Sequence, residues 1–402
     1  MARYVYDFAE GGRDRAGLLG GKGAGLAEMA RLGLPVPAGF TVSTEACRVH
    51  AATGAPPPEL DGEVEEHLVR LERAAGRRLG QVDDPLLLAV RPGAEPPVPG
   101  PPETVLDVGL NDHAVLGLAG TPARERFAWD SYRRLVERFG TVVMGVEPEL
   151  FERVRHRVGE QHHVADERLD ACDLIRVVET YKDLVAERTG EEFPQDPAEQ
   201  LRRAVRAVLV SWNSGSARAR RRRAGVPEGL ATAVTVQTMV SGNRGADSGS
   251  GVALTRDPAT GGPGASGVYL PDAQGEDVAA GVRDPLPLEE LGGSPRPRTR
   301  SWARTCGGWT ATTATCAPSS SPWSAGGCGS WASGPARGPC PGPSDGPPPG
   351  PLPRARADRG AGGREGRRGR TGRRRPGRPA VSGAVRASGT GRSGAAATPP
   401  GR

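Results

Sequence analysis

The residue in this chain with the clearest chemical role is Lys22, one of only two lysines among 53 basic residues. The other basic residues are arginines apart from Lys182, a bias typical of a GC-rich gene. Lys22 lies within the glycine cluster Gly20–Gly25. Glycines let backbone N–H groups approach a ligand closely, and a compact ammonium suits phosphate. The pattern fits phosphate binding and fits a flexible turn with a solvated lysine equally well.

Three further segments carry residues that could act on a nucleotide. The sequence Ala89-Val90-Arg91 predicts a strand that ends in a buried arginine and leads into a Gly/Pro loop. The second segment, 248–261, is rich in Gly, Ser and Thr. The third, 272–281, holds the adjacent acids Glu276 and Asp277, which could bind a ribose or Mg²⁺. For these two acids the alternative is a solvated turn.

The elements that must position these residues change in character along the chain. Residues 1 to about 110 alternate short apolar runs with Gly/Pro turns, as α/β segments do, and the glycine cluster leads into a short helix over 26–31. Residues from about 111 to 212 have helical spacing, and a further helix begins at Asp196-Pro197. From about 231 the pattern predicts strands over 233–240, 251–254 and 267–270, forming one β-meander.

The predicted helices have apolar stripes that we interpret as core. One contains Phe127, Tyr132, Leu135, Val136 and Phe139, with Arg133, Arg134 and Arg138 off it. The other contains Leu201, Val205, Val208, Leu209 and Trp212. Their aromatic residues are therefore expected to pack in the interior and not to bind a cofactor.

The composition changes after about residue 294, where Gly, Pro, Ser, Ala and Arg dominate. From Pro295 on there are 19 arginines, no lysine and three acids, a net charge of +16; because the whole chain carries +6, the preceding residues carry −10. Such a segment buries too little apolar surface to offset the entropy of ordering. We therefore expect 295–402 to be disordered.

Composition also excludes several classes of protein. Tyr4, Asp7 and Glu10 interrupt any secretory signal, and no apolar run approaches the roughly 20 residues of a membrane span. The cysteines lack the paired spacing and nearby histidines of a zinc site. We expect a cytoplasmic protein with no membrane partner and no structural metal.

Taken together, the motifs resemble one known family. In order, they read GGKGAGLAEM, LGLPVPAGF, ETVLDVGLND, TRDPATG and AQGEDVAAG. From residue 4 to about 290 this resembles the N-terminal nucleotide domain of pyruvate, phosphate dikinase. The resemblance implies an α+β ATP-grasp fold. Its two parts would be 1–110 and a β-rich 201–294, with a helical insertion at 111–200 and the basic tail 295–402 following.

The resemblance also implies a function and a site. The family moves the ATP β-phosphate to a histidine and then to pyruvate, so that ATP, phosphate and pyruvate become AMP, diphosphate and phosphoenolpyruvate. ATP and Mg²⁺ are the implied cofactors, and members are typically homo-oligomeric. By motif position the catalytic residues are Lys22 and Arg91, which contact the ATP phosphates. The implied nucleotide contacts are Ser250 and Gly251 at phosphate, Glu276 and Asp277, and the backbone near Gln237, Met239 and Val240 at adenine.

The sequence departs from the family in the loop after Arg91. Pro92, Pro97, Pro101 and Pro102 stiffen a loop that is expected to close over phosphate, and they remove N–H donors. In addition, Val268 replaces a usual glutamate.

The second departure is the tail. Reading the codons for 305–331 one base early permits a sequence that resembles the next family segment, and Trp309-Thr310 must then encode Asp. We infer a frameshift near Ser294. No histidine follows His163, so the phosphohistidine and pyruvate domains are expected to lie outside these 402 residues, leaving an incomplete enzyme.

The alternative function is a non-catalytic ATP-grasp relic whose arginine-rich tail binds nucleic acid non-specifically. No aromatic residue lies among the clustered arginines Arg367, Arg368, Arg370 and Arg373 to Arg375 to stack on bases, so nucleic acid is not the partner we expect.

Overall fold

The structure is a computed structural model, and it describes residues 2–290 except 96–102, 165–167, 228, 246–247, 257–262, 282 and 289. Most of the loop after Arg91 and the whole tail 295–402 therefore lie outside the described residues. So do the predictions of disorder and of a frameshift in the tail.

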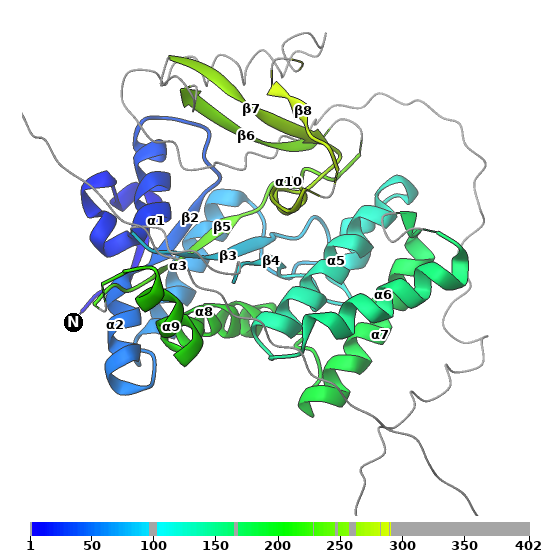
Figure 1. Cartoon of the computed structure of the whole chain (residues 1–402), viewed down its shortest axis with the longest axis horizontal. Coiled ribbons are helices and arrows are strands. Elements are labelled where there is room, and N and C mark those ends of the chain that lie inside the picture. Colours follow the sequence, from blue (N-terminus) through cyan, green and yellow to red (C-terminus); the bar gives the residue numbers. More distant parts are fainter. Residues whose placement is uncertain are drawn as a thin grey trace, which may run out of the picture. The chain divides into compact units, whose positions relative to one another are not determined.

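A five-stranded antiparallel sheet forms the centre of the described chain (Figure 1). In spatial order its strands are β1 (Val5–Asp7), β2 (Gly39–Val42), β5 (Ala233–Thr238), β3 (Leu88–Gly93) and β4 (Val105–Val108). The extended segment predicted from Phe40 is thus confirmed as β2. Strand β5 is central, because Gln237 pairs with Gly39 on one side and with Ala89 on the other.

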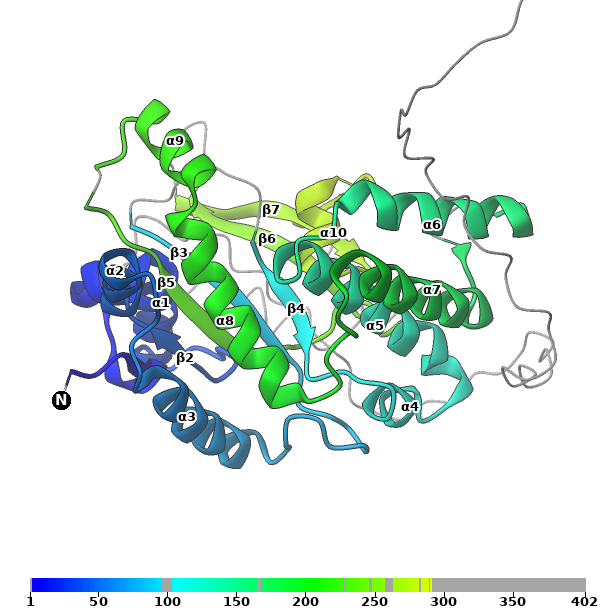
Figure 2. The same cartoon turned by 90° about the horizontal axis from the view of Figure 1, so that it is seen from below.

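Helices cover the two faces of this sheet. On one face lies α1 (Ala16–Arg31), where a Cβ added to Gly23 would be 2.7 Å from Thr41 Oγ1. On the other lies α3 (Leu60–Ala75), whose His67 ring centroid is 5.8 Å from that of Phe40. Figure 2 shows α8 (Pro197–Asn213) crossing the strands on the same side as α3. The short helices α2 (Thr44–Thr53) and α9 (Gly215–Arg223) flank it.

The helices predicted between 111 and 212 are confirmed. Before α8 come α4 (Ala114–Ala119), α5 (Pro122–Val142), α6 (Pro148–His162) and α7 (Ala171–Thr189). The start of α8 is capped as its sequence predicts, because the Asp196 carboxylate accepts the Ala198 N–H at 3.0 Å. The aromatic stripe is core, with Tyr132 and Phe139 packed edge-on against Phe193.

One residue of α5 differs from the prediction. Arg133 was expected to lie off the buried face, but it is only 7% exposed. It is paired with Asp130 at 2.9 Å and with Glu137 at 2.5 Å. The arginine is tolerated inside because two carboxylates compensate for its lost hydration.

The predicted β-meander is wrong in one respect. Strands β6 (Gly249–Arg256) and β7 (Pro263–Pro271) do pair antiparallel, and β8 (Leu286–Pro287) adds to β7. However, β5 does not belong to this second sheet, because both its edges are hydrogen-bonded to β2 and β3. Mixed helices and antiparallel sheets agree with the predicted α+β class.

Candidate functional site

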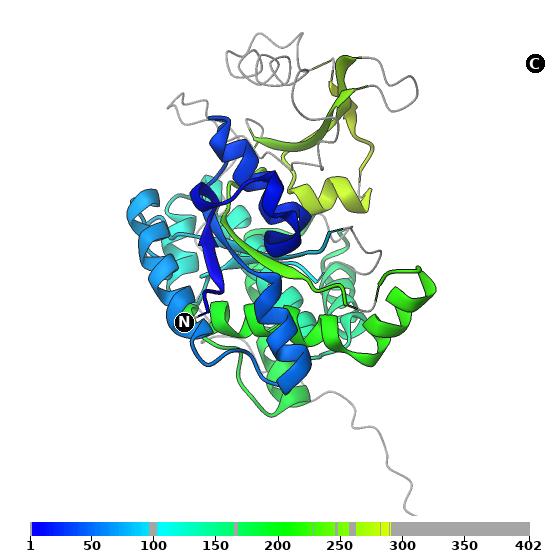
Figure 3. The same ribbon diagram turned by 90° about the vertical axis from the view of Figure 1, so that its left-hand side faces the viewer.

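The glycine cluster forms a kinked helix. The prediction began a helix at 26, yet α1 starts at Ala16 and breaks at Gly20, whose φ of 68° and ψ of 165° are not helical. A side chain there would be strained, and its Cβ would collide with the Gly93 carbonyl oxygen. Beyond the kink, helical structure restarts at Gly21, so Lys22 lies in a first helical turn. Figure 3 shows α1 in dark blue at one side of the sheet.

A restarted helix exposes N–H groups that have no partner in the preceding turn. These groups, together with the helix dipole, favour a negative charge at that end. The Glu95 carboxylate lies against Gly21 at this position, so an anionic group already approaches the start of the helical turn that carries Lys22.

The fold brings Arg91 to Lys22. In the sheet register, Thr41 lies opposite Thr235, and Thr235 lies opposite Arg91. Because opposed residues share a face of a pleated sheet, Arg91 is on the same face as Thr41, which packs under α1. A Cβ added to Gly93, two residues further along β3, would be 3.0 Å from Lys22 Cβ.

These two cations are half-buried, and neither side chain has a hydrogen bond or an ion pair with any residue the structure describes. Burial and the neighbouring Arg91 guanidinium lower the pKa of Lys22 to about 8. Burial also lowers the pKa of Arg91, an effect that the Glu276 carboxylate opposes. The pair is thus destabilised as it stands, and an anion between the two side chains would relieve it.

The other lysine shows the contrast. Lys182 donates to both carboxylate oxygens of Asp112, at 2.9 and 3.1 Å, and pairs with Glu179 at 3.0 Å. The same Asp112 accepts the Tyr132 hydroxyl at 2.8 Å. Lys182 therefore joins α7 to the segment between β4 and α4 and has a structural role.

The acidic pair lies on a short helix, α10 (Gly275–Ala280). Glu276 acts electrostatically on Arg91 and has a loose ion pair with Arg138 at 3.6 Å. Asp277 is more fully engaged, since both its oxygens accept from Arg134 at 2.8 and 3.3 Å. Thus Glu276 acts electrostatically on Arg91, whereas Asp277 is held in place by its hydrogen bonds from Arg134.

The segment expected to border adenine is partly occupied by the sheet. The Gln237 amide donates to the Pro37 carbonyl at 3.0 Å, and its backbone lies inside the ladder. The Met239 N–H donates to the Leu87 carbonyl at 2.8 Å. Val240 lies past the end of β5, and in the described residues its backbone N–H makes no hydrogen bond.

Ser250 and Gly251 lie in β6, and neither has a hydrogen bond with Lys22 or Arg91 among the described residues. Ser250 is fully buried, and its hydroxyl has no hydrogen-bond partner in the described part of the chain. It faces the turn at Gly242, while Gly251 packs closely against Val268 and Tyr269 of β7. Both residues lie inside the second sheet.

Sequence reasoning missed two residues next to this site, Arg134 and Asp107. Arg134 was placed off the core by its spacing alone. Asp107, in β4, has a φ of 58°, and both of its buried oxygens lack a partner among the described residues. Burial raises its pKa to about 8, with Glu276 adding to the effect and Arg134 opposing it. The one sequence signal is weak: Asp107 has a positive φ, a backbone conformation that aspartate adopts more readily than most residues.

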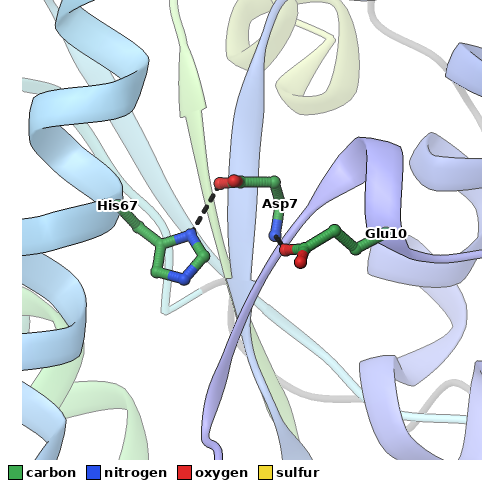
Figure 4. Close-up of side chains that lie close together, drawn as sticks. All are labelled: Asp7, Glu10 and His67. Carbon is green, nitrogen blue, oxygen red and sulfur yellow. Dashed lines mark hydrogen bonds and ion pairs between the residues drawn. The ribbon is translucent and has the colours of Figure 1, made fainter.

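One other cluster has ligand-type side chains but a structural explanation. Asp7, Glu10 and His67 gather where β1 meets α3 (Figure 4). His67 is hydrogen-bonded to Asp7 at 2.6 Å, and Glu10 accepts the Asp7 N–H at 2.8 Å while pairing with Arg3. With these partners the cluster holds β1 against its neighbours.

The fold and site together define an α+β domain in which Lys22 and Arg91 lie side by side without a hydrogen bond or ion pair to a described residue, and Arg91 lies within electrostatic reach of Glu276 on α10. None of the described helices is long and apolar enough to cross a membrane.

Comparison with known proteins identifies the family. Residues 16–56 and 55–287 match the family described as the pyruvate phosphate dikinase AMP/ATP-binding domain, and the chain belongs to it. Over 294 residues it is 47% identical to the pyruvate, phosphate dikinase of Clostridium symbiosum, covering 72% of this chain and 34% of that protein. Identity to the Rhizobium meliloti (strain 1021) enzyme is 46% over 299 residues, covering 72% and 33%. The chain therefore spans about a third of the length of these relatives.

Proposed function

We propose that this chain binds Mg·ATP in an ATP-grasp fold and serves as the nucleotide-binding domain of a pyruvate, phosphate dikinase. The family supports ATP as the ligand. The observation that carries the proposal is the half-buried Lys22–Arg91 pair, neither of whose side chains has a hydrogen bond or an ion pair with a described residue.

The triphosphate is the group that this pair would hold. Two adjacent cations removed from water are costly unless an anion neutralises both, and ATP supplies several negative oxygens in a row. The helical turn that restarts at Gly21 would add N–H groups that have no partner in a preceding helical turn. Lys22 and Arg91 would then stabilise charge on a transferring phosphoryl group, which is the largest contribution in this kind of catalysis.

A magnesium ion fits the donors present. Mg²⁺ is usually held by one or two carboxylates together with substrate phosphates. Glu276 is the carboxylate that acts on Arg91, and its only ion pair to a described residue is the loose one with Arg138. Glu276 would therefore hold the metal or the ribose beside the phosphates. When bound, the ion would neutralise phosphate charge.

The adenine would lie at the end of β5. Val240 follows the strand and has an N–H that makes no hydrogen bond in the described residues, so it can donate to a ring nitrogen. The neighbouring N–H groups of Thr238 and Met239 are already bonded to Ala38 and Leu87. Recognition through backbone groups thus centres on Val240.

The overall dikinase reaction would place this domain at its first step. In that reaction the ATP β-phosphate passes to a histidine and then to pyruvate, with phosphate as co-substrate. In this reaction the described residues would bind ATP for the first phosphoryl transfer. The later transfer to pyruvate is proposed by analogy with the relatives.

The proposal is tested by comparing the two lysines. Equilibrium binding of Mg·ATP to the full chain is expected to weaken at least tenfold in Lys22→Ala, or about 1.4 kcal/mol. Lys182→Ala removes an equally scarce residue and its ion pairs, so it should lower the melting temperature but leave ATP affinity within twofold. Equal ATP affinity in the parent and in Lys22→Ala would show that the phosphates bind elsewhere.

A further inference from the structure

A partly buried ion-pair network joins the helical segment to α10. Arg134, in α5, donates two parallel hydrogen bonds to Asp277, which is 143 residues away in sequence. Its Nε donates to Asp130 at 2.9 Å. Burial alone would lower the pKa of Arg134, but Asp130 and Asp277 outweigh it and raise that pKa. The guanidinium is thus held on both sides in a planar, bidentate geometry that a lysine could not reproduce.

Asp277 transmits this anchor to the start of α10. One of its oxygens also accepts the Gln274 N–H at 2.9 Å, which caps the helix. The Gln274 side chain in turn accepts the Gly242 N–H at 3.4 Å, and the Ala273 N–H donates to the Gly242 carbonyl at 3.0 Å. Gly242 lies two residues beyond Val240. The network therefore reaches both the helix that carries Glu276 and the turn that follows the proposed adenine strand.

A second contact on the same side of α5 supports this arrangement. Arg138, one helical turn after Arg134, pairs with Glu276 at 3.6 Å. Helix α10 is only six residues long. Such a short helix depends on outside contacts for its position.

We propose that Arg134 is a positioning residue for the nucleotide: through Asp277 it fixes α10 so that the Glu276 carboxylate faces Arg91. This inference rests on the proposed ATP site. The motif implied that both acids contact the nucleotide. In this proposal Asp277 holds α10 in place, and Glu276 contacts the ligand. The helical segment thereby becomes part of the nucleotide site.

A double-mutant cycle on Mg·ATP affinity tests the proposal. Arg134→Gln and Asp277→Asn should each weaken binding about tenfold, and the double variant should be no weaker than either single one, because both remove the same link. In a protein that already carries Glu276→Gln, the added substitution Arg134→Gln should weaken Mg·ATP binding by less than a further twofold. Arg134→Lys keeps the charge without the bidentate geometry, so its Mg·ATP affinity should lie between those of the parent and Arg134→Gln.

Arg133→Gln is the matched control, because Arg133 is on the same helix and shares Asp130, and both of its carboxylate partners, Asp130 and Glu137, lie within α5. It should lower the melting temperature and leave ATP affinity within twofold. Three results would overturn the proposal: independent, additive losses from Arg134 and Asp277; an undiminished Arg134 effect without Glu276; or an equal loss of affinity in Arg133→Gln.

The site itself is checked by Lys22→Ala in the same assay. If Lys22→Ala loses ATP while the Arg134 variants bind normally, the ATP site stands and only the positioning role falls. If the parent chain binds no Mg·ATP, both proposals fail together.

Discussion

At the residue scale, the environment separates two lysines that the composition makes equally conspicuous. Lys182 is neutralised by Asp112 and Glu179, whereas Lys22 lies beside Arg91 and has no acidic partner in the described residues. The sequence predicted Lys22 as a phosphate ligand because glycines surround it. The sequence could not predict that Asp277 would be engaged by Arg134, because that contact depends on how two distant segments fold together.

The lowered pKa of Lys22 predicts how ATP affinity depends on pH. With a pKa of about 8 in the free protein, Lys22 is mostly protonated at pH 7 and mostly neutral at pH 9. Only the ammonium form attracts phosphate, so affinity should fall roughly tenfold as pH rises from 7 to 9. Isothermal titration with Mg·ATP at several pH values would measure this.

Lys22→Arg provides the control, because a guanidinium stays protonated throughout this range. Its ATP affinity should be flat from pH 7 to 9. A flat profile in the unchanged chain would mean that the charge on Lys22 does not contribute to binding.

At the element scale, the local signals were reliable and the pairings were not. The start of α8 was predicted correctly because Asp196, Pro197 and Glu199 act within one helical turn. By contrast, β5 was assigned to a meander with β6 and β7. The alternating pattern of β5 fits any sheet, and its partners β2 and β3 come from much earlier in the chain.

Strand β4 gives a stability prediction through Asp107. Its pKa in the folded protein, about 8, is above the ordinary value of 3.8, so the folded state favours the protonated form. Its contribution to stability is therefore full below about pH 4 and is lost as pH rises toward 8. Asp107→Asn should raise the free energy of unfolding by roughly 3–4 kcal/mol more at pH 8 than at pH 5.

Urea denaturation of both proteins at these two pH values would measure the difference. Asp173→Asn is a useful comparison, since Asp173 is also buried but accepts a partner, the Asp170 N–H at 3.3 Å. The Asp173→Asn substitution should not raise the free energy of unfolding at pH 8. If Asp107→Asn has the same effect at pH 5 and pH 8, Asp107 is ionised in the folded protein.

At the scale of the whole molecule, long motifs in the right order identified the family from the sequence, and the structure then showed how they meet. Glycine motifs in α1, the arginine of β3 and the acids of α10 lie far apart along the chain, yet Lys22, Arg91 and Glu276 interact electrostatically. The helical segment looked like an insertion in the sequence. Its ion pairs through Arg134 and Arg138 instead connect it to α10, the helix that carries Glu276 and Asp277.

The most direct test of the central claim uses the scarcity of lysine in this chain. Amine acylation followed by mass spectrometry can report Lys22 and Lys182 separately in the unmodified protein, and near pH 8 about half of Lys22 is in the reactive neutral form. If ATP phosphates lie on Lys22, saturating Mg·ATP should slow acylation of Lys22 at least tenfold and leave Lys182 unchanged. Equal labelling of Lys22 with and without saturating Mg·ATP would contradict the account.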